Sequence, residues 1–501
     1  MTGGRIPSPS LPPVRSARRV VPRLLARRAL LFFALFVGPL AGACADVSRP
    51  VPVPRTAPVA TVAAADQRRL DDLERRTFGF FWETTSPQSG LVPDRWPTPS
   101  FSSIAAVGFG LTAYPIGVER GYVSRSAAAE RVLRTLRFFV GAPQGPEPAG
   151  RAGYHGFYYH FLDMASGTRF EHVELSTIDT ALLIAGALAS QAYFDRQDPT
   201  EREIRDLAEE LYRRADWTWI QPRPPLVAMG WTPEQGFHGW DWRGYNEAMI
   251  LYVLALGSPS HAIAPAAWKE YTRTYRFAEF YGQSNVAFPP LFGHQFSQAW
   301  IDFRGIQDDY MRAHGLDYFE NSRRAALAQR AYAIANPGGF RGYGAELWGL
   351  SACDGPADTD VEVEGRRRHF QTYAGRGAAA TEVLDDGTLT PHAALGSMPF
   401  VPAESLAALA AMRAYGDDLY GRYGFLDAFN PTLVTAIPLH HGKVVPGVGW
   451  FDTDYLGIDQ GILLVMVENY RSGLVWRLLR RNPHVRRGLE RAGFTGGWLR
   501  D

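Results

Sequence analysis

The feature that most constrains the fold of this chain is an alternation between two kinds of predicted helix. The segment "DTALLIAGALASQAYF", from Asp179, is apolar on nearly all sides. The segment "EREIRDLAEELYRRAD", from Glu201, has a charged face and an apolar stripe at the i, i+3, i+4 and i+7 positions from Ile204. Helices that are apolar all round belong in an interior, whereas amphipathic helices cover one. The alternation therefore predicts concentric helical layers, as in an α/α barrel or toroid.

Local start signals support the helices. Asp198 is placed to cap a helix whose first residue is Pro199, with Glu201 in its first turn, and Asp317 and Glu320 open a second helix in the same way. Other predicted helices begin near Asp66, Ser102, Ser124, Glu174, Gly244, Pro265, Pro402 and Ile458. Alternating strand patterns are scarce and short, so we expect an all-α domain.

The first 44 residues have the composition of an export signal. Seven arginines and no acids precede residue 29, and residues 29–43 form an apolar stretch that ends in small residues before Cys44. That stretch is shorter than the roughly 20 residues of a membrane-spanning helix. We expect a signal peptide with Cys44 as a lipidated first residue, which tethers the exported protein to a membrane in the periplasm or at the outer membrane. An ordinary cleaved signal, or a twin-arginine route through Arg27 and Arg28, is the alternative.

The remaining chain divides into a tether and one domain. Residues 45–65 carry four prolines among small residues and are typical of an extended tether. No second linker follows, so residues 66–501 are expected to form one domain. Loss of the seven arginines leaves 45 of the 52 basic residues against 51 acidic ones, which argues against a nucleic-acid partner. Cys353 has no second cysteine in the domain, which excludes an internal disulfide there.

Carboxylates in loops rich in glycine and aromatic residues are the candidates for chemistry. In "WDWRGYNEAMILYVLAL", residues 240–256, an aromatic segment leads through Tyr245 and Asn246 to Glu247 and then to an apolar run. Helix capping is the alternative role for Glu247, since acids favour the first turn. Further acids stand in similar places: Glu171, Glu174, Asp179, Asp302, Asp308, Asp427, Asp452, Asp454 and Asp459.

Each of these acids also has a purely structural alternative. Glu174 could be a first-turn acid, and Asp179 could bind a backbone amide or an arginine. Asp427 could stabilise the turn before Asn430 and Pro431. Burying a lone carboxylate is costly, so each should have a partner or a task.

Other catalytic schemes lack their residues. The sequence has no G-x-S-x-G elbow, no P-loop and no dinucleotide-binding glycine fingerprint after a strand. His440 and His441 lack metal-ligand spacing, and the aspartates after Trp450 do not fit a calcium loop. Cys353 has no histidine nearby in the sequence. Carboxylates and aromatic residues remain, and that combination fits glycoside hydrolysis.

Several long motifs resemble one known family. "TFGFFWE", "SIAAVGFGLTAYPIGVERG", "ELSTIDTALL", "GYNEAMILYVLALGSP", "PLFGHQFSQAWIDFRG", "SACDGP" and "DYLGIDQG" are similar to the bacterial glycoamylase-like domain, and most similar to glycoside hydrolase family 144, the β-1,2-glucanases. The resemblance covers residues 77–498. It implies an (α/α)6 barrel and an inverting hydrolysis of β-glucan, with β-1,2-glucan the first expectation, and it requires neither metal nor organic cofactor.

The resemblance also implies roles for particular residues. Glu247 matches the general acid, Glu174 another functional acid, and Asp427 the residue that activates water, with Asp454 in reserve. Residues that the resemblance and the aromatic loops place on the substrate are Glu171, Trp240, Trp242, Tyr245, Asn246, His294 and Arg304. Two other classes stay open: a surface glycan-binding lipoprotein without catalysis, and an α/α-barrel polysaccharide lyase.

Overall fold

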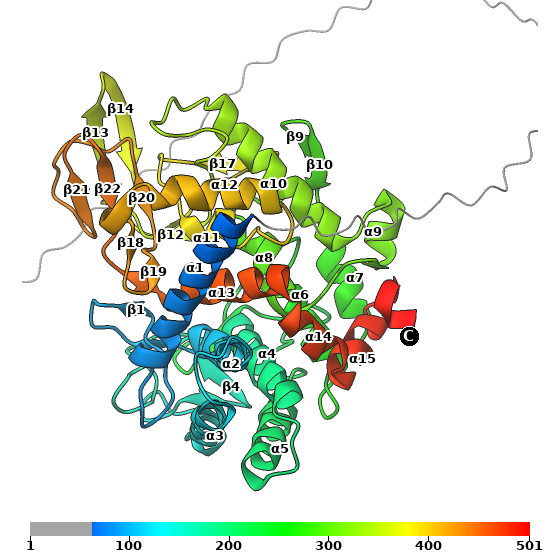
Figure 1. The fold of residues 1–501 in the computed structure, drawn as a ribbon. Helices are drawn as coiled ribbons and strands as arrows, with labels where there is room; N and C mark the ends of the chain where they lie inside the picture. Colours follow the sequence, from blue (N-terminus) through cyan, green and yellow to red (C-terminus); the bar gives the residue numbers. More distant parts are fainter. Residues whose placement is uncertain (1–62, 501) are drawn as a thin grey trace, which may run out of the picture. The chain divides into compact units, whose positions relative to one another are not determined.

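Helices dominate the computed structural model of this protein, which describes residues 63–500 (Figure 1). The predicted signal peptide, Cys44 and nearly all of the predicted tether lie outside the described residues. The helices are α1 (Ala64–Thr84), α2 (Ile104–Glu119), α3 (Arg125–Gly141), α4 (Thr177–Tyr193), α5 (Pro199–Arg214), α6 (Met249–Gly257), α7 (Ala266–Thr272), α8 (Phe292–Trp300), α9 (Asp309–His314), α10 (Tyr318–Ala335), α11 (Pro391–Leu395), α12 (Pro402–Arg413), α13 (Gly457–Arg471), α14 (Leu474–Arg480) and α15 (Pro483–Arg491). In residues 63–500, no helix combines the length and the apolar character that crossing a membrane requires.

The predicted caps are present at the helix starts. An Asp198 carboxylate oxygen accepts a hydrogen bond from the Glu201 N–H at 3.0 Å, and Asp317 accepts one from the Glu320 N–H at 2.7 Å. These bonds satisfy donors that the first turn of a helix leaves free. The predictions for the starts of α5 and α10 are therefore confirmed.

The helices form an inner and an outer group, as the alternation of the two helix types predicts. Almost every residue of α2, α4, α6 and α13 is buried. Along the inner group, α2 packs against α4, α4 against α6, α6 against α8, α11 against α13, and α13 against α2. The Gln295 amide joins α8 to α11 by donating to the Ala393 carbonyl at 2.8 Å.

Each inner helix is covered by an outer one. The pairs are α3 on α2, α5 on α4, α15 on α6, α10 on α8, α12 on α11 and α1 on α13. Figure 1 shows α1 beside α13, and α15 near α6. The outer helix α5 buries Ile204, Ala208 and Leu211 and exposes its charged face.

The expectation of an all-α domain needs correction, because 24 short strands accompany the helices in residues 63–500. The largest sheet has five strands, β3 (Gly153–Tyr154), β4 (Phe157–Tyr159), β6 (Leu175–Ser176), β7 (Gly230–Thr232) and β8 (Gly236–Phe237). A three-stranded sheet holds β20 (Phe429–Asn430), β22 (Gly449–Phe451) and β21 (Lys443–Val445).

The other strands form pairs. These are β1 (Arg95–Trp96) with β23 (Tyr455–Leu456), β2 (Ser102–Ser103) with β5 (Phe161–Leu162), β9 (Phe277–Phe280) with β10 (Gln283–Val286), β11 (Ile306–Gln307) with β24 (Thr495–Gly496), β12 (Ala352–Cys353) with β15 (Ala374–Gly375), β13 (Thr359–Val363) with β14 (Arg366–Phe370), β16 (Gly377–Ala379) with β17 (Glu382–Leu384), and β18 (Tyr420–Gly421) with β19 (Gly424–Phe425). Most have only two or three residues, too few for an alternating pattern to be visible in the sequence.

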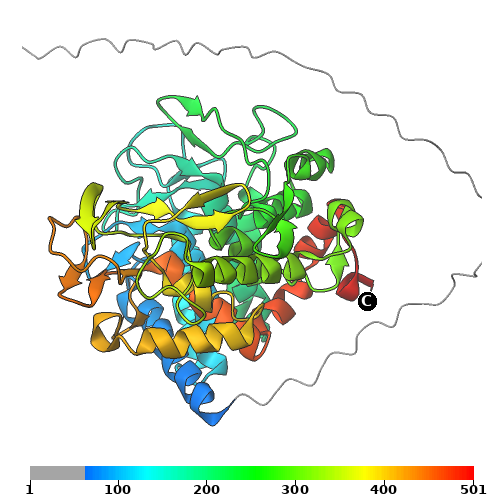
Figure 2. The same ribbon diagram turned by 90° about the horizontal axis from the view of Figure 1, so that it is seen from above.

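The strands have a clear place relative to the inner helices. β2, β6 and β23 each end one residue before the start of α2, α4 and α13. In Figure 2 the green and yellow strands lie to one side of the helices drawn in yellow-green and orange. The strands β2, β6 and β23 therefore lie at the end of the domain at which these inner helices begin.

The two helices α2 and α4 cross in close contact at a pair of glycines. A Cβ atom on Gly186 would lie 2.0 Å from the Gly108 carbonyl oxygen, and a Cβ on Gly108 would lie 2.3 Å from the Leu182 carbonyl oxygen. Only glycine permits this distance between the backbones.

Candidate active site

A cavity of about 370 Å³ opens where the inner helices begin. Its polar wall is made of carboxylates and histidines, and its apolar wall of aromatic and aliphatic side chains. The lining residues are His160, Glu174, Ser176, Ile178, Asp179, Leu182, Met229, His238, Trp242, Glu247, Phe292, Phe296, Ala352, Tyr373, Ile458 and Asp459. A few polar groups in a mainly apolar pocket are typical of a ligand site.

Glu247 lies in the wall of this cavity, two residues before α6 begins. The side chain of Asn246, not that of Glu247, accepts a hydrogen bond from the Ala248 N–H, at 3.0 Å. The capping interpretation of Glu247 is therefore wrong. Burial raises the pKa of Glu247 to about 7, and the negative charge of Asp179 adds to this rise. Glu247 can thus hold a proton near neutral pH.

Glu174 and Asp179 form a second acidic group on the polar wall, with a histidine between them. His160 Nδ1 lies 2.8 Å from a Glu174 carboxylate oxygen, and His160 Nε2 lies 3.5 Å from Asp179. Burial favours the neutral form of Glu174, but the hydrogen bond and the charge of His160 outweigh it and lower the pKa of Glu174. The first-turn interpretation of Glu174 is wrong, because Asp179 is the acid in the first turn of α4 and Glu174 precedes the helix. The Asp179 side chain accepts a hydrogen bond from the Ser176 hydroxyl.

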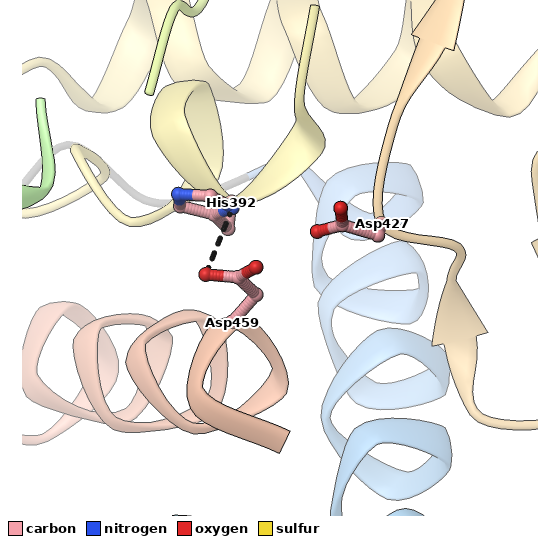
Figure 3. A group of neighbouring side chains, drawn as sticks. All are labelled: His392, Asp427 and Asp459. Atoms are coloured by element: carbon pink, nitrogen blue, oxygen red, sulfur yellow. Dashed lines mark ion pairs between the residues drawn. The ribbon is translucent and has the colours of Figure 1, made fainter. Parts of the chain in front are cut away.

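Asp459 supplies a further carboxylate, from the first turn of α13 (Figure 3). His392 Nδ1, on α11, lies 3.2 Å from an Asp459 oxygen, and Asp427 lies beside this pair. Burial raises the pKa of Asp459 to about 7, although a hydrogen bond with Asp427 opposes the rise. Burial also lowers the pKa of His392 to about 3, so its imidazole is neutral.

Asp427 is buried behind Asp459 rather than in the cavity wall. Its carboxylate accepts a hydrogen bond from the Asp354 N–H at 2.7 Å. Burial and the neighbouring charge of Asp459 raise its pKa well above the usual range. This environment favours the protonated form of Asp427, in which it can donate a hydrogen bond to Asp459.

Asp454 lies outside the cavity lining. Its carboxylate accepts a hydrogen bond from the Thr98 N–H at 3.0 Å, and it lies 3.8 Å from the Arg95 guanidinium. These contacts join the segment before α13 to the loop after β1. The structure assigns Asp454 a contact that holds two loops together.

The predicted substrate-binding residues take different places. Trp242 lines the cavity and donates its indole N–H to the Thr177 hydroxyl at 2.9 Å. Tyr245, Asn246 and His294 are buried outside the cavity lining. Trp240 is 75% exposed, and Glu171 is exposed too. Arg304 pairs with Asp302 and lies over the Trp476 ring. The structure thus brings Glu247, Glu174 and Trp242 together, and it does not bring the other eight predicted residues into the cavity wall.

Thirteen of the sixteen lining residues were not among the predicted site residues, and they include His160, His238, Tyr373 and Asp459. One sequence signal does point to Asp459. An Ile-Asp pair occupies the second and third residues of both α4 and α13, and all four side chains, Ile178, Asp179, Ile458 and Asp459, line the cavity. This short repeat marks two inner helices that present the same residues to one site.

Two groups of side chains could hold a metal ion in residues 63–500. The potential ligand atoms of His392, Asp427 and Asp459 lie within 4.8 Å of one another, and so do those of Asp354, Asp427 and Asp452. His440 and His441 belong to neither group.

Comparisons with known proteins identify the family. A sequence profile of the family described as "Putative glucoamylase" matches residues 239–483. A "putative glucoamylase" structure from Bacteroides uniformis is 32% identical with a TM-score of 0.74, and the match covers 87% of this chain and 98% of that one. The chain belongs to this glycoamylase-like family. The resemblance inferred from the motifs is confirmed.

Other relatives of this glycoamylase-like protein are named for their activities. An endo-β-1,2-glucanase from Chitinophaga pinensis, solved with sophorotriose and glucose, is 28% identical with a TM-score of 0.73, over 87% of this chain and 100% of that one. An exo β-1,2-glucooligosaccharide sophorohydrolase from Parabacteroides distasonis is 28% identical over 87% of this chain. The chain spans only 59% of the length of that curated relative.

Proposed function

We propose that this glycoamylase-like protein is a glycoside hydrolase that cleaves β-1,2-glucan. The single observation that carries the proposal is one cavity with Glu247 and Asp459 in its wall, both with pKa values raised to about 7. Two carboxylates that can differ in protonation near neutral pH are the equipment of a glycosidase. The choice of the β-1,2 linkage rests on the activities for which the relatives from Chitinophaga pinensis and Parabacteroides distasonis are named.

We infer that the inner helices close into an (α/α)6 barrel. The packing order α2, α4, α6, α8, α11, α13 and back to α2 supports this, as does one outer helix on each inner one. In such a ring α6 and α13 are three places apart. Glu247 and Asp459, near the starts of these helices, then stand on opposite sides of the cavity.

That placement favours an inverting reaction. Inverting glycosidases need room between their two carboxyl groups for a sugar and a water molecule. In the reaction, Glu247 donates its proton to the glycosidic oxygen while the bond from C1 to that oxygen breaks. Water attacks C1 from the other side, and Asp459 takes the proton that the water loses. Free acid and base are restored by proton exchange with solvent.

Asp459 thus replaces Asp427 and Asp454 as the residue that activates water. Asp427, protonated behind it, stabilises the ionised form of Asp459 through their hydrogen bond. Asp454 keeps its place between two loops. The apolar wall, with Trp242 and Phe292, suits the faces of sugar rings, and Glu174 accepts hydrogen bonds from their hydroxyl groups.

A panel of polysaccharides tests the proposal. The purified protein is incubated with β-1,2-, β-1,3- and β-1,4-linked glucans and with a uronic acid polymer, and new reducing ends and absorbance from a new double bond are recorded. We expect reducing ends from β-1,2-glucan. Binding of the glucan without cleavage would indicate the non-catalytic lipoprotein, and a double bond formed in the uronic acid polymer would indicate the lyase.

A further inference from the structure

The ring of His160 is fixed in the cavity wall by its own backbone and by a neighbouring ring. His160 lies between β4 and β5, its N–H donates to the Glu174 carbonyl at 2.9 Å, and its carbonyl accepts from the Ile104 N–H at 3.3 Å. Its imidazole stacks on Phe161, with ring centroids 4.0 Å apart. These contacts within the protein fix the orientation of the ring.

Both ring nitrogens of His160 face a carboxylate. Nδ1 lies 2.8 Å from Glu174 and Nε2 lies 3.5 Å from Asp179. A histidine can donate from both nitrogens only when it is protonated. Burial alone would lower the pKa of His160, but Asp179, Glu174 and Asp94 together raise it to about 9. His160 is therefore an imidazolium at neutral pH.

Other charged groups also act on His160, Glu174 and Glu247. Asp94, 3.6 Å from its partner Arg95, acts on His160 from the loop before β1. His238 acts on Glu174 from the loop after β8, and Asp179 acts on Glu247 before α6. His160 is the cation in hydrogen-bond contact with Glu174, and the same ring lies beside Asp179.

We propose that His160 is a positioning residue of the proposed hydrolase. As a cation between Glu174 and Asp179, it keeps Glu174 ionised and holds both carboxylates in the cavity wall. There the two carboxylates accept hydrogen bonds from sugar hydroxyl groups, and the charge of Asp179 adds to the burial that raises the pKa of Glu247. This role rests on the proposed function, because it serves the acid that donates to the glycosidic oxygen.

Removal of the cation should change the pH at which the site works. Without His160, only a backbone hydrogen bond and His238 still oppose the effect of burial, and the pKa of Glu174 rises from its lowered value. As the pH falls, Glu174 then takes up a proton in the range in which Asp459 also does, and its hydrogen bonds to the substrate are lost. The acidic limb of the pH–rate profile of His160→Gln therefore moves to higher pH.

The test compares His160→Gln with the matched control His155→Gln. His155 also faces an acid, Asp216 at 3.6 Å, and its side chain is 33% exposed against 32% for His160, but it lies outside the cavity lining. For His160→Gln we expect a loss of about 10- to 100-fold in kcat at neutral pH and the shifted acidic limb, and for His155→Gln a profile like that of the wild type. An equal loss at all pH values, with no shift of that limb, would reduce His160 to a structural role and overturn the proposal.

A spectroscopic measurement separates this proposal from the proposed function. In the labelled wild-type protein, the imidazole nitrogen signals that are absent from His160→Gln should remain those of an imidazolium at pH 7 and titrate near pH 9. Titration of His160 at or below its ordinary pKa of 6.5 would overturn the proposal whatever the protein hydrolyses. A protein inactive on β-1,2-glucan, yet with a protonated His160, would count against the proposed function alone.

Discussion

At the scale of single residues, the pH dependence of the reaction follows from two carboxyl groups. The proposed hydrolysis needs Glu247 protonated and Asp459 ionised, and both pKa values lie at about 7. As the pH rises through 7, Glu247 loses the proton that it must donate. As the pH falls through 7, Asp459 gains a proton and no longer accepts one from water. We therefore expect kcat/KM, measured from about pH 5 to about pH 9, to be bell-shaped with a maximum near 7, whereas a constant value above pH 7 would contradict the acid role.

The same substitution at two aspartates, Asp459 in the first turn of α13 and Asp454 just before β23, separates chemistry from structure. Asp459→Asn should lower kcat on β-1,2-glucan by about 10²- to 10⁴-fold, because an amide cannot take a proton from water. Asp454→Asn keeps an oxygen for the Thr98 N–H, but it loses the negative charge that faces Arg95. It should therefore lower the free energy of unfolding by about 1 kcal/mol and retain most of the activity. Assays and denaturant titration of both variants measure this. An equal loss of activity in the two would contradict the assignment of Asp459.

The sequence pointed to part of this site only. Three residues of the cavity wall could be predicted from the sequence, because each lies in a distinctive aromatic or helix-start motif: Glu247, Glu174 and Trp242. His160 follows a strand of three residues, and only the pairing of β4 with β6 brings it to Glu174. Asp459 lay within a recognised motif, but its proximity to the cavity depends on α13 packing between α2 and α11. Long-range packing of this kind leaves no local pattern.

At the scale of the elements, the close crossing of α2 and α4 can be tested by adding a methyl group at the crossing point. Gly186→Ala would place a Cβ 2.0 Å from the backbone oxygen of Gly108, and backbone atoms cannot move aside as a flexible side chain can. We expect denaturant titration to show a loss of about 1–3 kcal/mol in the free energy of unfolding. The control is Gly141→Ala at the end of α3, where no atom lies within 4 Å of the added Cβ, and we expect a change within about 0.5 kcal/mol. Equal stability of the two variants would contradict the close crossing.

Most helices were predictable because their signals are local. Asp198 and Asp317 each cap a helix by accepting a hydrogen bond from the N–H three residues further along the chain. The apolar positions of α5 repeat at helical spacing. The strands were not predictable for the opposite reason. β2, β6 and β23 have two residues each, and their hydrogen-bond partners come from distant parts of the chain.

At the scale of the whole molecule, the predicted export signal can be tested separately from the site. We propose that Cys44, outside the described residues, carries a lipid that holds the enzyme at a membrane. Cys44→Ala should then move the protein from the membrane fraction of cells to the soluble fraction, with its activity on β-1,2-glucan unchanged. Unchanged fractionation would show that the protein has no anchor at Cys44.

The most direct test of the account is the kinetic effect of Glu247→Gln, which keeps the shape of the side chain and removes its proton. Glu130→Gln, on the exposed face of α3, is the control for the substitution itself. For Glu247→Gln we predict a loss of about 10²- to 10⁴-fold in kcat on β-1,2-glucan, and a smaller loss on an aryl glycoside, whose leaving group needs little protonation. Hydrolysis of β-1,2-glucan at the wild-type rate by folded Glu247→Gln protein would contradict the assignment of Glu247 as the general acid.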